Sequence, residues 1–154
     1  MSATVFDRLT ARLTEVSVDF AVTHHAPVFT SEEAAAVRGV SLSSGAKALV
    51  VKAGDAFVLL VVPADRKLDS KKARSVLGVK SLRFATREEV ESLTGLQPGS
   101  IPPFGSLFGL PTRCDPALGL NERINFNAGD HAISIGMTFA DYRAAESPEM
   151  AEVT

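Results

Sequence analysis

The stretch KALVVKAGDAFVLLVV, from Lys47 to Val62, decides the fold class of this 154-residue chain. It contains two apolar runs, residues 47–53 and 56–62, which flank the dipeptide Gly54-Asp55. A turn signal of this kind between two Val- and Leu-rich runs is typical of a β-hairpin. Because polar residues hardly alternate with apolar ones, we expect both faces of the two strands to be covered. The stretch therefore predicts a hairpin at the centre of a sheet.

Helix signals lie on both sides of this hairpin. Phe6, Leu9, Leu13 and Val16 recur at helical spacing and predict an amphipathic helix near the N-terminus. Four further helices are predicted where a capping residue opens a segment. These openings are Thr30 with Glu33, Asp69 before residues 70–77, Thr86 with Glu89, and Thr138 with Asp141. Short strands are expected over residues 19–23, 81–85, 112–114, 123–127 and 131–137. Bunched strands in a mixed order favour an α+β fold.

Composition limits the classes of function. The length fits one domain over residues 1–154, and a hydrophobic fraction of 45% is sufficient for a core. The net charge of −2 excludes binding to nucleic acid through a general excess of positive charge. Half of the sixteen basic residues nevertheless fall between positions 66 and 87, which is either a solvated helix face or a local guide for phosphates. A single cysteine, Cys114, excludes an internal disulfide.

No membrane or export segment is expected. The first sixteen residues carry charges throughout and contain no apolar core of the kind found in a leader. The longest strongly apolar stretch, residues 56–62, is far shorter than the roughly 20 residues that cross a bilayer. We therefore expect a cytoplasmic protein without a membrane partner.

A loop rich in proline and glycine is the first candidate for chemistry. Residues 95–121 contain five prolines and five glycines, among them the segment GSIPPFG from Gly99 to Gly105. Pro102 and Pro103 lack amide donors and stiffen the chain, whereas the glycines permit unusual backbone angles. Such a loop can present fixed amides to an anion or to a developing oxyanion. The alternative is a packed crossover without a ligand.

Lys47 and the histidines are the other candidates. Lys47 opens an apolar run, so its ammonium group either extends to water as a strand-end lysine or points into a pocket. His131 directly precedes a predicted strand, and His24 and His25 end another. A metal site made of the three histidines and Asp115 matches no standard ligand spacing. No family signature supports Cys114 as a nucleophile with His131 as its base.

Five pieces of the sequence, in this order, resemble the YbaK family, the editing domains associated with prolyl-tRNA synthetase. The likeness runs from about residue 19 to residue 142. The pieces are HHAPVFTSEEAA, GAKALVVKAGDAFVLLVVPADRKLD, LTGLQPGSIPPFG, LPTRCDPAL and INFNAGDHAISI.

This resemblance implies an α+β fold with a mixed, partly open, β-barrel-like sheet flanked by helices. It also implies a free-standing aminoacyl-tRNA deacylase that hydrolyses the ester of a mischarged tRNA, with a small amino acid on tRNA-Pro or a related tRNA as the substrate. The expected partners are the acceptor end of that tRNA and an aminoacyl-tRNA synthetase. No cofactor and no metal are implied. The alternative is a non-catalytic module that binds a tRNA end or a synthetase.

The family motifs assign roles to individual residues. The conserved lysine corresponds to Lys47, the GxxxP loop begins at Gly99, and the glycine-any-histidine element ends at His131; these three are the expected catalytic residues. Water is expected to attack the ester with help from the ribose hydroxyl of the tRNA. An apolar wall that limits substrate size is expected from Val28, Phe29, Leu49, Ile101 and Phe104. The residues expected to bind the substrate are His25, Thr30, Ser100, Ile101, Pro102, Pro103, Phe104, Gly105, Asp115 and Gly129.

Overall fold

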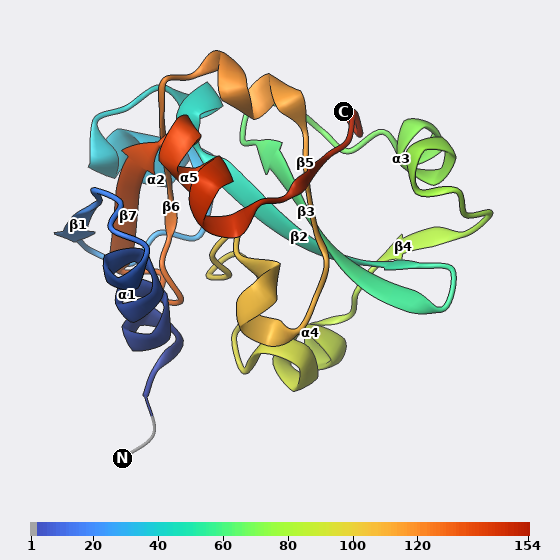
Figure 1. Ribbon diagram of the computed structural model, residues 1–154, viewed down its shortest axis with the longest axis horizontal. Coiled ribbons are helices and arrows are strands. Elements are labelled where there is room, and N and C mark those ends of the chain that lie inside the picture. The colour runs from blue at the N-terminus through green and yellow to red at the C-terminus, as the bar shows by residue number, and fades with distance from the viewer. Residues whose placement is uncertain (1–2) are drawn as a thin grey trace.

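The predicted hairpin forms the centre of the larger of two sheets (Figure 1). The computed structural model describes residues 3–154. Strands β2 (Ala46–Ala53) and β3 (Ala56–Pro63) pair in antiparallel register, with Ala53 opposite Ala56 across the expected turn. In β3 the last six residues are all buried, as the unbroken apolar run predicts. In β2 the Lys47 end is partly open.

Three short strands extend this sheet in the order β4-β2-β3-β5-β8. Strand β4 (Leu82–Phe84) runs antiparallel to β2. Strand β5 (Thr112–Cys114) runs parallel to β3, and β8 (Glu149–Met150), which the sequence did not predict, runs parallel to β5. The sheet is therefore mixed.

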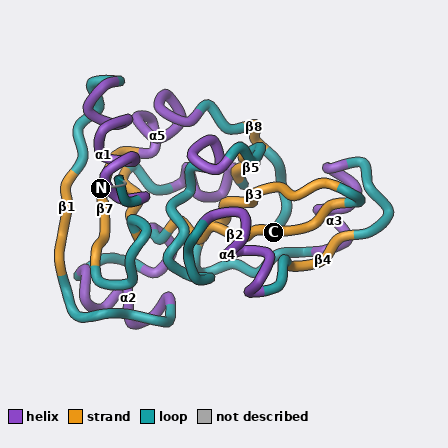
Figure 2. Tube along the Cα trace, turned by 90° about the horizontal axis from the view of Figure 1, so that it is seen from below, coloured by secondary structure: helices purple, strands orange, loops and turns teal. Residues whose placement is uncertain are grey.

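A second, antiparallel sheet has the order β1-β7-β6. It consists of β1 (Ala21–His24), β7 (Ile133–Thr138) and β6 (Arg123–Asn127). A single bridge between Gly45 and Asn125 links it to the larger sheet. In Figure 2 this sheet lies on the side away from the outer end of the β2–β3 hairpin, which runs out beside β4 and α3. The predicted α+β class with a mixed, partly open arrangement is confirmed, although the strands form two sheets and do not close into a barrel.

The five predicted helices are present, and each begins at an expected capping residue or amphipathic segment. They are α1 (Val5–Glu15), α2 (Ser31–Arg38), α3 (Ser70–Leu77), α4 (Arg87–Thr94) and α5 (Phe139–Glu146). Short 3-10 helices cover Leu42–Ser44, Gly105–Phe108 and Pro116–Leu120. Over residues 3–154, no helix has the length and apolar character that a membrane crossing requires.

The main core lies between the two sheets and the inner faces of α1 and α5. Its centre is aromatic: the ring of Phe104 packs edge-on against Phe126, with centroids 5.7 Å apart, and against Tyr142, with centroids 5.2 Å apart. All three side chains are fully buried. Such edge-to-face pairs add stabilisation beyond the burial of their area. The loop that contains Phe104 is thereby anchored in the core.

A buried carboxylate holds the last residues of the chain. Asp115 Oδ2 accepts hydrogen bonds from the amides of Val153 and Thr154 at 2.9 and 3.0 Å and from the Thr154 hydroxyl at 2.8 Å, while Oδ1 accepts one from the amide of Ala117 at 2.8 Å. Burial raises the pKa of Asp115, but these hydrogen bonds outweigh that effect and leave the pKa below its ordinary value. Asp115 was expected to bind substrate, but in the structure its carboxylate anchors the C-terminal residues.

We predict that Asp115→Asn lowers the free energy of unfolding at pH 7 by about 1–3 kcal/mol, because an amide group replaces an oxygen that faces donors. The pKa is lower in the folded chain, so this stabilisation is complete above the unfolded pKa of about 3.9 and is lost as the pH falls through the folded pKa. Urea unfolding of both proteins at neutral and at acid pH measures the difference. A difference that does not shrink in acid would contradict the assignment.

Candidate active site

An open pocket of about 680 Å³ lies beside the Lys47 end of β2. Strand β2 provides its floor, α2 and β6 provide two walls, and the Gly99 loop together with the segment after β3 closes the rest. At this end of β2 the side chains are partly exposed, whereas most of the strand's other half is buried. The pocket therefore sits at the junction between the sheets.

The three residues expected to be catalytic all line this pocket: Lys47, Gly99 and His131. The Lys47 side chain is exposed and not buried. The His131 ring stacks on Phe29 with a centroid distance of 4.8 Å. Gly99 has a φ of +91°, and a Cβ at this position would lie 3.5 Å from His131 Nε2. The positive φ disfavours any other residue at position 99.

The Gly99 loop is held through its carbonyl oxygens. The Gly99 carbonyl accepts a hydrogen bond from Asn127 Nδ2 at 2.7 Å, and the Ser100 carbonyl accepts one from the Gly129 amide at 2.9 Å. The Pro103 carbonyl accepts one from the Tyr142 hydroxyl at 2.7 Å. Within residues 3–154, no protein acceptor takes the amide hydrogen of Gly99 or Ile101. Both residues line the pocket.

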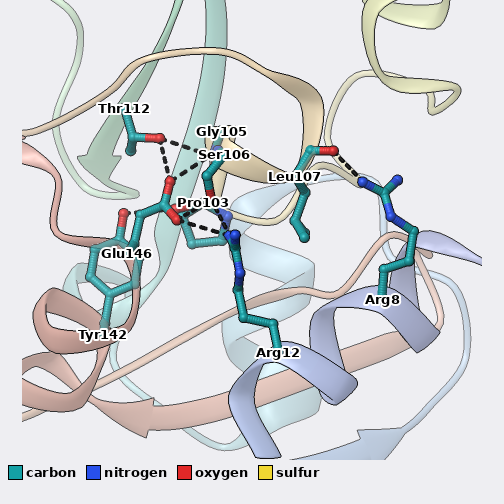
Figure 3. Close-up of polar contacts among 9 residues, drawn as sticks. All are labelled: Arg8, Arg12, Pro103, Gly105, Ser106, Leu107, Thr112, Tyr142 and Glu146. Carbon is teal, nitrogen blue, oxygen red and sulfur yellow. Dashed lines mark hydrogen bonds and ion pairs between the residues drawn. The ribbon is translucent and has the colours of Figure 1, made fainter. Parts of the chain in front are cut away.

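A polar cluster of α1 and α5 braces the segment that follows this loop (Figure 3). Glu146, whose side chain is 2% exposed, accepts hydrogen bonds from the Ser106 amide at 3.1 Å and from the Thr112 hydroxyl at 2.7 Å. Arg12 forms an ion pair with Glu146 at 3.5 Å and a hydrogen bond with the Ser106 hydroxyl. Arg8 donates to the Leu107 carbonyl. Two helices far apart in sequence thus fix residues 105–112.

Most of the other residues expected to bind substrate lie behind the pocket wall. Thr30 and Ile101 line the pocket, and Thr30 also caps α2. Eight do not line it: His25, Ser100, Pro102, Pro103, Phe104, Gly105, Asp115 and Gly129. Six of these eight are buried: Asp115 and five residues of the loop itself. At Gly105, for example, a Cβ would lie 2.5 Å from the Thr112 hydroxyl oxygen, so glycine is needed there for close packing.

Four of the five residues expected to form the apolar wall line the pocket, and one does not. Val28, Phe29, Leu49 and Ile101 line the pocket, whereas Phe104 belongs to the core because its ring packs against Phe126 and Tyr142. The sequence did not identify the other apolar lining residues, several of which come from β2, α4 and β6. They include Ala46, Ala48, Val50, Val90 and Phe126.

Arg38 is the functional candidate that sequence reasoning missed. Its side chain lines the pocket and donates to three neutral oxygens: Ser134 Oγ at 2.7 Å, Asn125 Oδ1 at 2.8 Å and Asn127 Oδ1 at 2.7 Å. Burial lowers the pKa of Arg38 to about 10, so the side chain remains charged at neutral pH. The only signal in the sequence was its place before Gly39, where a cation at a helix C-terminus is ordinary. His25 joins this network, with Nε2 at 2.7 Å from Ser134 Oγ.

Cys114 lies in the core and not in the pocket. Burial raises the pKa of its thiol to about 12, with the Asp115 carboxylate as a further cause, so the nucleophilic thiolate does not form near neutral pH. In the part of the chain that the structure describes, no three His, Cys, Asp or Glu side chains converge as ligands of one metal ion.

Comparison of the fold defines the class of protein. The structure superimposes with a TM-score of 0.87 on a crystal structure described as a candidate trans-editing enzyme for prolyl tRNA synthetase, with 26% identity over all of this chain and 99% of the other. The model of the aminoacyl-tRNA editing domain family matches residues 25–145. The chain belongs to this family, as the sequence resemblance predicted.

Individual relatives agree with this membership. The chain is 36% identical over 148 residues to the multifunctional Ser/Thr-tRNA deacylase ProXp-y of Escherichia coli, which covers 93% of this chain and 89% of the relative. It is 31% identical over 134 residues to the proline–tRNA ligase of Bacillus licheniformis, but spans only 23% of that enzyme.

We predict that Tyr142→Phe lowers the free energy of unfolding by about 1–3 kcal/mol, because the buried Pro103 carbonyl loses its donor without any change in packing volume. Burial raises the pKa of Tyr142 well above its usual range, so the hydroxyl is a donor at every working pH. Urea denaturation checks this prediction. Equal stability of the two proteins would show that the Tyr142 contact does not hold the loop.

Proposed function

We propose that this protein is a trans-editing deacylase that hydrolyses the ester of a mischarged tRNA in the pocket beside β2. The membership of the family and the close similarity to a Ser/Thr-tRNA deacylase support this class of activity. The observation that carries the assignment of the site is the meeting of Lys47, Gly99 and His131 in one pocket, from three distant parts of the sequence. We further propose that residues 1–154 act as one editing domain.

The reaction requires little from the protein beyond positioning. An aminoacyl ester is already activated, so fixed geometry and stabilisation of the oxyanion can provide much of the rate. Water attacks the ester carbonyl carbon, the bond to the ribose oxygen breaks, and that oxygen leaves with a proton as a free hydroxyl. The vicinal ribose hydroxyl orients the water. The amides of Gly99 and Ile101 stabilise the oxyanion, because no protein acceptor among residues 3–154 uses them.

Lys47 and His131 hold the substrate around this centre. Lys47 is exposed in the pocket, where its ammonium group can bind the 3′-terminal phosphate or the acyl carbonyl oxygen. His131, whose ring packs against Phe29, shapes the wall beside Gly99. The apolar residues of β2, together with Val28 and Ile101, limit the size of the amino acid. A synthetase rejects a substrate that lacks one methylene by only about 1–3 kcal/mol, which is why a second site of this kind is useful.

The mouth of the pocket suits the acceptor end of a tRNA. Arg66 and Lys67 line it near Lys47, against the two acidic lining residues Glu32 and Asp65. Phe29 and Phe84 also line it, and they are 71% and 58% exposed. Exposed aromatic rings beside cations can stack unpaired bases while the cations bind phosphates. We place the activity in the cytoplasm, where the proposed substrate is made, with the synthetase as a further partner.

We predict that Lys47→Ala reduces deacylation at least 100-fold while the protein stays folded, because the substrate loses the pocket cation that binds its 3′ end. Lys52→Ala is the matched control: Lys52 lies on the same strand five residues away, hence on the opposite face, with its ammonium 5.9 Å from the centroid of the Phe57 ring. Release of the amino acid from alanyl-, seryl- and cysteinyl-tRNA measures the activity.

Three outcomes of this assay separate the hypotheses. Loss of activity in Lys47→Ala but not in Lys52→Ala supports the proposal. Full activity of Lys47→Ala would reject the role of this lysine. A wild-type protein that binds these tRNAs without releasing any amino acid would instead support the alternative of a non-catalytic binding module.

We predict that Arg66→Ala with Lys67→Ala raises KM for aminoacyl-tRNA about tenfold at low salt and changes kcat little, because these cations contact phosphates and not the ester. The dependence of KM on salt should become less steep, since fewer counterions are displaced. Lys71→Ala with Lys72→Ala is the control, because these lysines lie on α3 and do not line the pocket. Equal effects of the two pairs would place the tRNA along α3 and not at the pocket mouth.

A further inference from the structure

Arg38 is connected to the Gly99 loop by two consecutive hydrogen bonds. Its Nη2 donates to Asn127 Oδ1 at 2.7 Å, and Asn127 Nδ2 donates to the Gly99 carbonyl at 2.7 Å. The Asn127 amide group thus has both ends occupied, one as acceptor and one as donor. This fixes its orientation, because exchanging its oxygen and nitrogen would lose both bonds.

The other contacts of Arg38 hold this pair in place. Its Nε and Nη1 donate to Ser134 on β7 and to Asn125 on β6. Asn125 in turn donates to the Ser44 hydroxyl at 2.8 Å. The guanidinium group is therefore tied to two strands of the smaller sheet, and it cannot rotate without breaking several bonds at once. A planar guanidinium with a fixed fork of donors suits such a role better than a lysine.

All of these acceptors are neutral. Over residues 3–154, no carboxylate lies within 4.0 Å of the Arg38 side chain to form an ion pair. An aspartate at position 127 would pair with the charge more strongly, but it could not donate to the Gly99 carbonyl. An asparagine at this position serves both contacts, as acceptor to Arg38 and as donor to Gly99.

We propose that Arg38 and Asn127 are positioning residues that fix the Gly99–Ser100 peptide and thereby the relative placement of the two neighbouring peptides, whose amides, those of Gly99 and Ile101, receive the oxyanion. This proposal rests on the proposed deacylase function. The bond from Asn127 fixes the peptide group made of the Gly99 carbonyl and the Ser100 amide, and the bond from Gly129 fixes the next one, which carries the Ile101 amide. The peptide fixed by Asn127 therefore lies between the two peptides that carry the Gly99 and Ile101 amides. A misplacement of about 1 Å at such a group can cost about 100-fold in rate.

Asn127→Asp provides the sharpest test. It preserves the shape of the side chain and its contact with Arg38, but places an acceptor against the Gly99 carbonyl. We expect kcat for deacylation to fall 10- to 100-fold with KM changed less than about threefold. The midpoint of thermal unfolding should stay within a few degrees of wild type, since the new ion pair with Arg38 offsets the repulsion at Gly99. Arg38→Lys should lower kcat in the same direction.

Asn121→Asp is the matched control. Asn121 also donates to backbone carbonyls, those of Ser43 and Leu118 at 3.0 and 3.2 Å, but it does not line the pocket. The same chemical change there should leave kcat unaltered. Should Asn127→Asp fail to fold, Asn127→Ala removes the donor without repulsion and is expected to lower kcat by a smaller factor. Wild-type kcat in either Asn127 variant would overturn the proposal.

A readout that does not depend on catalysis separates this proposal from the proposed function. The amide NMR signals and hydrogen-exchange rates of Gly99, Ser100 and Ile101 should change in Asn127→Asp and stay unchanged in Asn121→Asp. If the wild type deacylates none of the tRNAs, the proposed function fails. Independently of that result, unchanged amide signals in Asn127→Asp would show that Asn127 does not position the Gly99 loop. Changed signals together with an active wild type but an unchanged kcat would show that the contact shapes the loop without affecting the reaction.

Discussion

The segment from Gly99 to Gly105 is fixed through its carbonyl oxygens, and the rest of the site depends on this constraint. Pro102 and Pro103 have no amide hydrogen, so the middle of this segment cannot donate backbone hydrogen bonds. Asn127, Gly129 and Tyr142 donate to the carbonyls of Gly99, Ser100 and Pro103. Within residues 3–154, the amides of Gly99 and Ile101 remain without a protein acceptor. In a pocket, free and fixed amides are the groups that stabilise an oxyanion without reorganising during the reaction.

The donors that fix the loop come from distant parts of the chain. Asn127 ends β6, and Gly129 lies in the connection from β6 to β7. Tyr142 lies on α5, and Arg12 on α1 joins Glu146 in bracing the next turn. The loop therefore takes its final shape only when the smaller sheet and both helices have packed. Phe104 belongs to the same segment, and its buried ring packs against Phe126 on β6 and Tyr142 on α5. Phe104 therefore joins the segment to two of the elements that hold it.

Local signals predicted the elements well, because capping boxes and the Gly54-Asp55 turn act over three or four residues. The Thr30, Thr86 and Thr138 caps open helices at the expected positions. The family motifs predicted Lys47, Gly99 and His131 as site residues, and all three line one pocket. The motifs could not distinguish residues that face the pocket from those that support it, since burial of Phe104 and Asp115 depends on partners far away in sequence. Arg38 was missed for the same reason: its three acceptors lie 87 to 96 residues further along the chain.

The charge of the pocket follows from the same arrangement. Arg38 is half-buried and shares its protons with amide and hydroxyl oxygens, so its positive charge is not neutralised by a neighbouring carboxylate in the described part of the chain. Lys47, on β2 at the floor of the pocket, adds a second cation. A positive potential between them favours a substrate with a phosphate on one side of the ester and a developing oxyanion on the other. Neutral acceptors therefore serve two purposes at once: they hold the guanidinium in place, and they leave its field available to the reaction.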